Sequence, residues 1–198
     1  MSIKPLAIRN AYEKYGVKTF YQHFGDSYRN PHEAVIFKVI EAVHTAYQPD
    51  FSQVLDLACG SGEVTLALLK LGYIQVDGIE PYTFKAYFER TGKRAEKYRF
   101  EEIETGILSE RRYTTIICSF ALHLAIPSRL PILSYQLSRI APTLLVITPH
   151  KNPQIRSQWG WTLLNELLVE RVRARLYQSD NLKLTDTIPK RDSIRFPV

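Results

Sequence analysis

The stretch Val54-Leu-Asp-Leu-Ala-Cys-Gly-Ser-Gly-Glu-Val-Thr65 decides how the rest of the chain is interpreted. Its first four residues are mostly apolar, which is typical of a buried parallel strand. Gly60-Ser-Gly62 then breaks the strand, and a helical pattern of apolar residues begins at Val64. This order presents free backbone N–H groups and the positive end of a helix to a ligand. The stretch therefore predicts a ligand site at the end of a strand, against the alternative of a tight turn without a ligand.

Two acidic residues indicate the kind of ligand. In a dinucleotide site the glycines cradle a pyrophosphate, and a third glycine is expected where Thr65 stands. That glycine is missing here, and Asp56 would repel a pyrophosphate, whereas it suits a neutral or cationic ligand that carries an ammonium group. A second acid is then expected at the tip of the next strand, where it can bind ribose hydroxyls. Glu80 follows the apolar Ile79 at this point, and the rival acid Asp77 falls inside the strand.

Residues 54–62, followed by Ile79-Glu80-Pro81-Tyr82, resemble the cofactor half of class I S-adenosylmethionine-dependent methyltransferases. The resemblance spans Phe51 to His150, and Ala58 departs from it, because the family often has glycine there. It implies an α/β fold with a doubly wound, mostly parallel, seven-stranded sheet. Helices should cover both faces, the last strand or strands should be antiparallel, and S-adenosylmethionine should be the cofactor.

The resemblance also implies roles for single residues. The backbone from Gly60 to Gly62 would pass beneath the amino-acid part of the cofactor, Glu80 would bind the ribose, and Ser119 and Phe120 would lie near the methionine end. The residue that meets the adenine should come from Arg99 to Glu102. The complete set of predicted cofactor-binding residues is Asp56, Ala58, Gly60, Gly62, Glu80, Pro81, Tyr82, Phe100, Glu101, Cys118, Ser119 and Phe120.

The length of 198 residues predicts a single domain, 1–198, with an N-terminal cap and first helix (1–50), a cofactor-binding core (51–150) and a C-terminal helix and strands (151–198). No apolar run approaches a membrane span, and the N-terminus lacks the core of a signal peptide. Cys59 and Cys118 lie in apolar contexts, which indicates reduced thiols and a cytoplasmic location. No spacing suggests a metal site, and the sequence leaves the oligomeric state open.

The remaining secondary structure follows from apolar periodicity and from caps. The resemblance implies that an aromatic segment, residues 12–32, folds over the cofactor as part of the cap, with Tyr12, Tyr15 and Tyr28 facing the substrate; a plain packing role for these tyrosines is the alternative. Helices are expected after the N-cap Asn30, over 82–89 up to Thr91-Gly92, over 127–140 and over 163–168. Strands are expected over 98–103, 114–118, 143–148 and 169–177. The segment 182–198 is expected to hold a last strand or to be a loose tail.

The loop after the fourth predicted strand bears on the reaction. Its sequence is Cys118-Ser-Phe-Ala-Leu-His123. It lacks the Asn/Asp-Pro-Pro-aromatic motif that is typical of enzymes that methylate the amino group of adenine in DNA. No acidic residue stands between Glu110 and Glu166, which excludes a carboxylate base from this loop or the next. His123 is then the candidate general base, with loop orientation as its alternative role, and His150 is a candidate substrate contact.

The net charge of +6 raises the question of an anionic partner. The sequence alternates Arg171, Arg173 and Arg175 with apolar residues, which predicts a half-exposed strand with a basic face. We favour a solvated surface for this face and a small molecule as the methyl acceptor at oxygen, nitrogen or a similar nucleophile. The alternatives are methylation of RNA or protein with this basic face, and a non-catalytic subunit that binds the cofactor or a partner.

Overall fold

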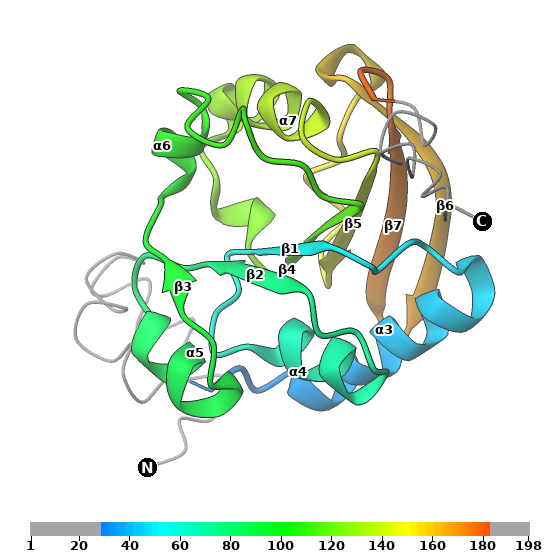
Figure 1. The fold of residues 1–198 in the computed structure, drawn as a ribbon. Helices are drawn as coiled ribbons and strands as arrows, with labels where there is room; N and C mark the ends of the chain where they lie inside the picture. The colour runs from blue at the N-terminus through cyan, green and yellow to red at the C-terminus, as the bar shows by residue number, and fades with distance from the viewer. Residues whose placement is uncertain (1–28, 183–198) are drawn as a thin grey trace, which may run out of the picture.

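The computed structural model describes residues 29–182, and Figure 1 shows their arrangement as one twisted sheet with helices on both faces. Within these residues the sheet has seven strands in the order β3-β2-β1-β4-β5-β7-β6. The first five are parallel, and β7 runs antiparallel to both of its neighbours. The strands are β1 (Val54–Leu57), β2 (Val76–Ile79), β3 (Ala95–Glu96), β4 (Thr115–Ser119), β5 (Thr143–Thr148), β6 (Trp161–Val169) and β7 (Val172–Ser179). The expected doubly wound α/β fold is confirmed.

The helices form the two outer layers. In Figure 1, α3, α4 and α5 lie below the sheet, and α6 and α7 lie above it. The helices are α3 (Glu33–Tyr47), α4 (Glu63–Lys70), α5 (Phe84–Thr91), α6 (Phe100–Ile103) and α7 (Leu130–Ser138), with 3-10 turns at Leu122–Leu124, Pro127–Arg129 and Ser157–Trp159. The central strands are largely apolar because both of their faces are covered: Val54 joins the cluster under α3 and α4, whereas Leu55 joins the cluster under α7.

The start of the first described helix differs from the prediction. Asn30 was expected as its N-cap, but α3 begins at Glu33, and His32 occupies the cap position. The Asn30 Oδ1 instead accepts a hydrogen bond of 2.9 Å from the backbone N–H of His32, so the side chain forms a turn that precedes the helix. The apolar face of the helix is as expected, with Val35, Ile36, Val39, Ile40 and Val43 buried.

The third strand is also shorter and earlier than predicted. It comprises only Ala95 and Glu96, while residues 100–103, expected in the strand, form the one-turn helix α6. A local cap explains the helix: Glu102 Oε2 accepts a 2.9 Å hydrogen bond from the backbone N–H of Arg99, and the Glu102 N–H donates to the Arg99 carbonyl. Glutamates at the first turn then favour a helix start over a strand.

The largest error concerns residues 163–168, which were expected to be helical and belong to β6 instead. The run Leu-Leu-Asn-Glu-Leu-Leu has the apolar spacing of one helix face, so periodicity alone favoured a helix. The hairpin turn at Glu170-Arg171 overrides it, because both residues adopt positive φ angles, 47° and 69°, and join β6 to β7. Within residues 151–182 the C-terminal region has no α-helix, contrary to expectation.

The predicted strand over 169–177 exists as β7, displaced to Val172–Ser179, but it is not half-exposed. It lies between β5 and β6 in the sheet, and both of its faces are largely buried. The expectations for Tyr12, Tyr15, Tyr28 and the C-terminal tail concern residues 1–28 and 183–198, which lie outside the described part of the chain. In residues 29–182, none of the helices combines the length and apolar character needed to span a bilayer.

Candidate functional site

A cavity of about 400 Å³ lies at the carboxyl ends of the parallel strands. Its walls come from the ends of β1, β2 and β4 and the residues that follow them, from the segment 98–101 before and within α6, and from Asn30 and Ile36 at the start of α3. The strand order reverses between β1 and β4, and open α/β sheets bind ligands in the crevice at such a switch point. The volume is within the range of small-molecule sites.

The glycine turn forms one wall of this cavity with an unusual backbone. Ala58, Gly60 and Gly62 all have positive φ angles, of 56°, 57° and 92°. At Gly62 a side chain has no room, because an added Cβ would lie 2.5 Å from Thr91 Cγ2. Ala58 tolerates the left-handed conformation at a cost of about 1 kcal/mol, which explains why the resembled family often has glycine at this position.

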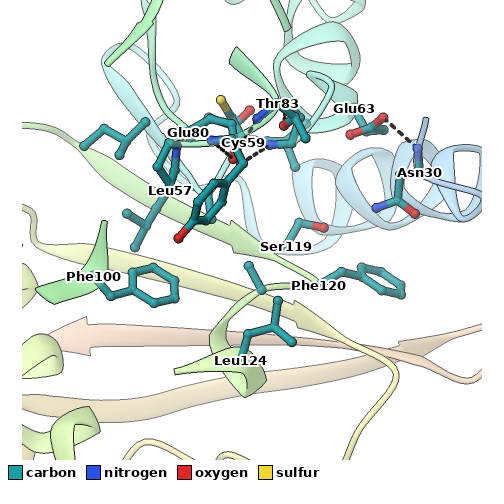
Figure 2. A pocket seen from close by; sticks show the side chains of 18 of the residues that line it. Asn30, Leu57, Cys59, Glu63, Glu80, Thr83, Phe100, Ser119, Phe120 and Leu124 are labelled. Atoms are coloured by element: carbon teal, nitrogen blue, oxygen red, sulfur yellow. Dashed lines mark hydrogen bonds between the residues drawn. The ribbon is translucent and has the colours of Figure 1, made fainter. Parts of the chain in front are cut away.

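Glu80 occupies the tip of β2 with its carboxylate fixed by the backbone. Its Oε1 accepts hydrogen bonds from the N–H groups of Tyr82 (2.9 Å) and Thr83 (3.2 Å), and its Oε2 accepts one from Gly60 (3.1 Å). Figure 2 shows these bonds on the side of the pocket that carries the glycine turn. Burial raises the pKa of Glu80, and the three N–H donors counteract the rise. The carboxylate thus connects the turn after β1 with the turn after β2, and Glu80 lines the cavity between them.

Asp56 is more deeply buried than Glu80, with 1% of its surface exposed. Its Oδ2 accepts hydrogen bonds from the backbone N–H (3.1 Å) and the hydroxyl (2.7 Å) of Thr65 in α4. Burial raises the pKa of Asp56 to about 7, and the nearby Glu63 and Glu80 carboxylates add to the rise. Asp56 therefore fastens the strand to the helix and lines the cavity as a carboxyl group that titrates near neutral pH.

Glu63 lines the cavity and is 3% exposed, and it was not among the predicted site residues. Its Oε1 accepts hydrogen bonds from Arg90 (2.9 Å) and from the backbone N–H of Asn30 (3.4 Å), and also from the Ser61 hydroxyl. Arg90 also pairs with Glu33 at 2.7 Å. An acid directly after the glycine turn and a distant arginine were the available signals, but only the fold brings them together with the start of α3.

The tip of β4 closes the opposite side of the cavity. Phe120 has a φ of 54°, a strained conformation for a residue with a bulky side chain, and its ring stacks on His32 at 4.8 Å. The hydroxyl of Ser119 is buried and has no hydrogen-bond partner within the described residues. Strained backbone and unsatisfied buried polar atoms are more frequent at functional sites, so both features make this edge a candidate ligand contact.

Most of the predicted cofactor-binding residues come together in this cavity. Gly62 and Cys118 do not line it: the α-carbon of Gly62 faces α5, and Cys118 lies inside β4, 1% exposed. Both cysteines are free and buried, as expected, and burial raises their pKa values, that of Cys118 to about 12. The predicted residues that line the cavity are Asp56, Ala58, Gly60, Glu80, Pro81, Tyr82, Phe100, Glu101, Ser119 and Phe120; those that the prediction missed include Asn30, Ile36, Glu63, Thr83, Tyr98 and Leu124.

The two candidate histidines form a pair beside the cavity. The rings of His123 and His150 are 4.6 Å apart, which joins the loops after β4 and β5. Neither residue belongs to the lining, although the adjacent Leu124 does. Both residues reach the surface, but partial desolvation lowers the pKa of His123, and the neighbouring His150 lowers it further, which favours the neutral imidazole.

The prediction of a basic face on this strand is wrong, because its arginines do not form a continuous exposed surface. Arg175 is 2% exposed, and its guanidinium donates to Glu166 Oε2 and to the carbonyls of Lys151 (2.9 Å) and Pro153 (3.2 Å). Arg173 donates to the other oxygen of Glu166 at 2.7 Å. The two arginines therefore stabilise the hairpin and the loop after β5, and only Arg171 remains exposed.

The part of the chain described by the structure contains no group of three or more His, Cys, Asp or Glu side chains that could hold a metal ion. The sequence matches no protein-family model. An uncharacterised protein of Schizosaccharomyces pombe is 28% identical, over 90% of this chain and 94% of that protein.

Several solved structures share the fold. Magnesium protoporphyrin IX methyltransferase from Synechocystis, solved with bound S-adenosylmethionine, superposes with a TM-score of 0.55 at 15% identity, over 90% of this chain and 97% of that one. A putative RNA methyltransferase from Pyrococcus horikoshii gives 0.56 at 16% identity (77% and 87% covered), and a TehB-like methyltransferase from Corynebacterium glutamicum gives 0.56 at 13% (89% and 100%). The chain thus has the fold that these S-adenosylmethionine-dependent methyltransferases share.

Proposed function

We propose that this protein binds S-adenosylmethionine and transfers its methyl group to a nucleophile on a small molecule. The observation that carries the proposal is the Glu80 carboxylate, which three backbone N–H groups hold between the β1 and β2 turns, at the edge of a cavity at the switch point. The fold shared with S-adenosylmethionine-dependent methyltransferases supports it.

The residues around the cavity fit this cofactor. A carboxylate has about four acceptor positions, and Glu80 uses three of them for backbone donors, which leaves capacity for a ribose hydroxyl. Tyr82 and Phe100 would flank the adenine. The Ser119 hydroxyl, which has no partner within residues 29–182, would bond to the amino-acid end, and the Asp56 carboxyl would favour its ammonium group.

The bound cofactor would supply a methyl group on a sulfonium cation, which becomes neutral on transfer. The protein would then need to hold the acceptor in line with this methyl group, exclude water and take up a proton. His123 is the proposed base, because its neutral imidazole can accept a proton from a hydroxyl or amine, and His150 would contact the substrate. The proton of the acceptor would end on the His123 imidazole as the new bond forms.

A small-molecule acceptor is favoured over RNA because two of the three arginines proposed for RNA binding are internally paired. Arg173 and Arg175 share Glu166, so the hairpin offers phosphate few free cations. A filter-binding assay checks this: we expect weak RNA retention. Tight, salt-sensitive retention that Arg173→Glu abolishes would instead favour an RNA methyltransferase.

Titration calorimetry tests the cofactor, with S-adenosylhomocysteine and S-adenosylmethionine as ligands and NAD as the control. We expect saturable heat with both sulfur nucleosides and none with NAD. The opposite result would refute the proposed cofactor. Formation of S-adenosylhomocysteine with a panel of hydroxyl and amine acceptors then tests turnover, and binding without turnover across the panel would favour a non-catalytic subunit.

A further inference from the structure

Three buried polar groups form a chain of hydrogen bonds that leads from the cavity to α5. Asp56 of β1 lines the cavity, and its Oδ2 accepts hydrogen bonds from the backbone N–H (3.1 Å) and the hydroxyl (2.7 Å) of Thr65 in α4. The Thr65 hydroxyl in turn lies 3.0 Å from the hydroxyl of Tyr87 in α5. All three residues are at most 1% exposed, so the direction of each bond has to satisfy the others.

The Tyr87 hydroxyl is held in place at the end of this chain. The tyrosine ring lies against Gly78 of β2, where an added Cβ would be only 2.8 Å from the phenolic oxygen. Burial raises the pKa of Tyr87, and the nearby Asp56 charge raises it further. The hydroxyl therefore keeps its proton at neutral pH and acts as a donor.

The donors in the chain fit together in one order. The backbone N–H of Thr65 can only donate, so the Asp56 Oδ2 that faces it is an acceptor. The Thr65 hydroxyl has a single proton, and when this proton points at the same Oδ2, the hydroxyl oxygen accepts from Tyr87. The opposite order would place a proton on Oδ2 against the N–H of Thr65 and would leave the Tyr87 proton without this acceptor.

The two oxygens of Asp56 therefore differ. Oδ2 receives two donors, whereas Oδ1 accepts no hydrogen bond from residues 29–182. When the carboxyl is neutral, its proton is on Oδ1, because Oδ2 remains the acceptor. Since Oδ2 faces α4 and Asp56 lines the cavity, Oδ1 is the oxygen that is available to a ligand.

We propose that Tyr87 is a positioning residue: through Thr65 it keeps Oδ2 of Asp56 an acceptor and thereby fixes the exchangeable proton on Oδ1, where a ligand displaces it. The inference rests on the proposed function for the identity of that ligand, the ammonium group of S-adenosylmethionine. When the ammonium binds, the Oδ1–H bond breaks and the proton goes to the solvent. The electron pair stays on Oδ1 and accepts an N–H of the ammonium group.

The ionisable groups around Asp56 keep its carboxyl in need of a cation. The groups that influence it, or that it influences, are Glu63 of α4, Glu80 after β2, Cys59 in the glycine turn, Cys118 of β4 and Tyr87 of α5. All of them are acids, and Arg90, a cation of this region, is paired with Glu63 and Glu33. Burial and the glutamates raise the pKa of Asp56 to about 7, so a bound cation and a proton compete for Oδ1 near neutral pH.

Infrared spectroscopy of the ligand-free protein tests the position of the proton, with Asp56→Asn as the reference that identifies the band. At a pH well below the pKa of about 7, the C=O of Asp56 should be Oδ2, whose two hydrogen bonds lower its stretching frequency. Tyr87→Phe weakens the Thr65 donor, so this band should move to higher frequency. Tyr113→Phe is the matched control, because Tyr113 is also buried and donates to Asp77 at 3.2 Å, outside the cavity lining; the band should not move.

A second pair of variants keeps the result decisive if the loss of the Tyr87 hydroxyl changes the packing. Thr65→Val removes the hydroxyl donor itself and should move the band further than Tyr87→Phe, whereas Thr65→Ser keeps the donor and should leave the band in place. A band that stays at the wild-type frequency in both Tyr87→Phe and Thr65→Val would place the proton on Oδ2 and overturn the proposal. Circular dichroism confirms that each variant is folded.

The pH profile of ligand binding tests the consequence for the site. Tyr87→Phe should raise the pKa of Asp56 by about half a unit, because a weaker donor stabilises the carboxylate less, and affinity for S-adenosylmethionine at pH 7 should fall about twofold. Tyr113→Phe should bind like the wild type. An unchanged pH profile in Tyr87→Phe would overturn the positioning role. If the wild type binds no sulfur nucleoside at all, the proposed cofactor fails, and the infrared band still decides the role of Tyr87.

Discussion

The two halves of the cavity are built by different means. On the β1 and β2 side, the buried Asp56 carboxyl accepts hydrogen bonds from Thr65 of α4, and the buried Glu80 carboxylate accepts hydrogen bonds from the backbone of the neighbouring turns. On the β4 and β5 side, the Ser119 hydroxyl has no partner within the described residues, and the histidine pair is exposed. The comparison teaches that the first half is organised before a ligand arrives, whereas the second half offers groups whose partners a ligand would supply.

The largest expected effect tests the buried carboxyl of the first half. Because the pKa of Asp56 is raised to about 7 from 3.8, the folded protein holds a proton between these values that the unfolded chain has lost. The free energy of unfolding should therefore decrease as the pH rises from 4 to 7, by about 4 kcal/mol from this group alone, and its contribution should be constant above pH 8. Denaturant unfolding of the wild type and of Asp56→Asn at several pH values measures it.

The Asn variant keeps an oxygen acceptor for Thr65 but cannot titrate, so its stability should lack this decrease. Parallel pH profiles for wild type and variant would contradict the assigned pKa. If a cationic ligand group binds beside Asp56, its binding at pH 7 should also release up to about half a proton, because a group with a pKa of about 7 is half protonated there, and calorimetry in buffers of different ionisation enthalpy detects this release.

The second prediction concerns the backbone of the glycine turn. Gly62→Ala should lower the free energy of unfolding by about 3 kcal/mol, because the methyl group meets Thr91 Cγ2 at 2.5 Å and φ is 92°. Gly72→Ala is a matched control, since Gly72 also has a φ of 92° but no atom within 4 Å of the added carbon, and should cost only about 1 kcal/mol. Equal losses in thermal or urea unfolding would show that the close approach to α5 has no energetic weight.

The first half could be predicted from sequence because its rules are local. The apolar run of β1, Gly60, Gly62 and the position of Glu80 after Ile79 each depend on a few neighbouring residues. Phe100 was identified as a cavity residue although its segment was assigned to a strand, since the cavity depends on its place in the chain more than on its local structure. In the sequence, Ala58 is only a departure from the pattern of the resembled family. Its positive φ angle in the structure explains why that family often has glycine at this position.

Long-range pairing explains what the sequence left out. Glu63 and Arg90 are 27 residues apart and meet only after α5 has packed beside the glycine turn. The burial of Arg175 depends on the loop after β5 and on β6, so an alternating pattern could not distinguish a paired arginine from an exposed one. The same holds for residues 163–168, whose helical spacing was overridden by pairing with β7.

The third prediction measures the acid at the tip of β2. Glu80→Ala should weaken the binding of S-adenosylhomocysteine by about 1–3 kcal/mol, because it removes the charged acceptor proposed for the ribose and frees three backbone donors. Asp77→Asn is the control on the same strand, as Asp77 is exposed and lies outside the cavity lining. Calorimetry with both variants compares the acids directly, and an equal loss in both would refute the assignment of Glu80.

The smallest expected effect, that of Ser119→Ala, separates the two halves most sharply, because the substitution should raise stability and lower affinity. Ser119→Ala removes a buried hydroxyl that has no partner among the residues that the structure describes, so the free energy of unfolding should rise by about 1 kcal/mol. If a ligand bonds to this hydroxyl, affinity for S-adenosylhomocysteine should fall by a similar amount. The described chain contains a matched control, since Ser134 in α7 also has a buried hydroxyl without a partner but does not line the cavity. Ser134→Ala should therefore stabilise the protein and leave affinity unchanged. Unchanged affinity in both variants would mean that the β4 tip is not a ligand contact, and the difference between the two halves would then reduce to a packing defect.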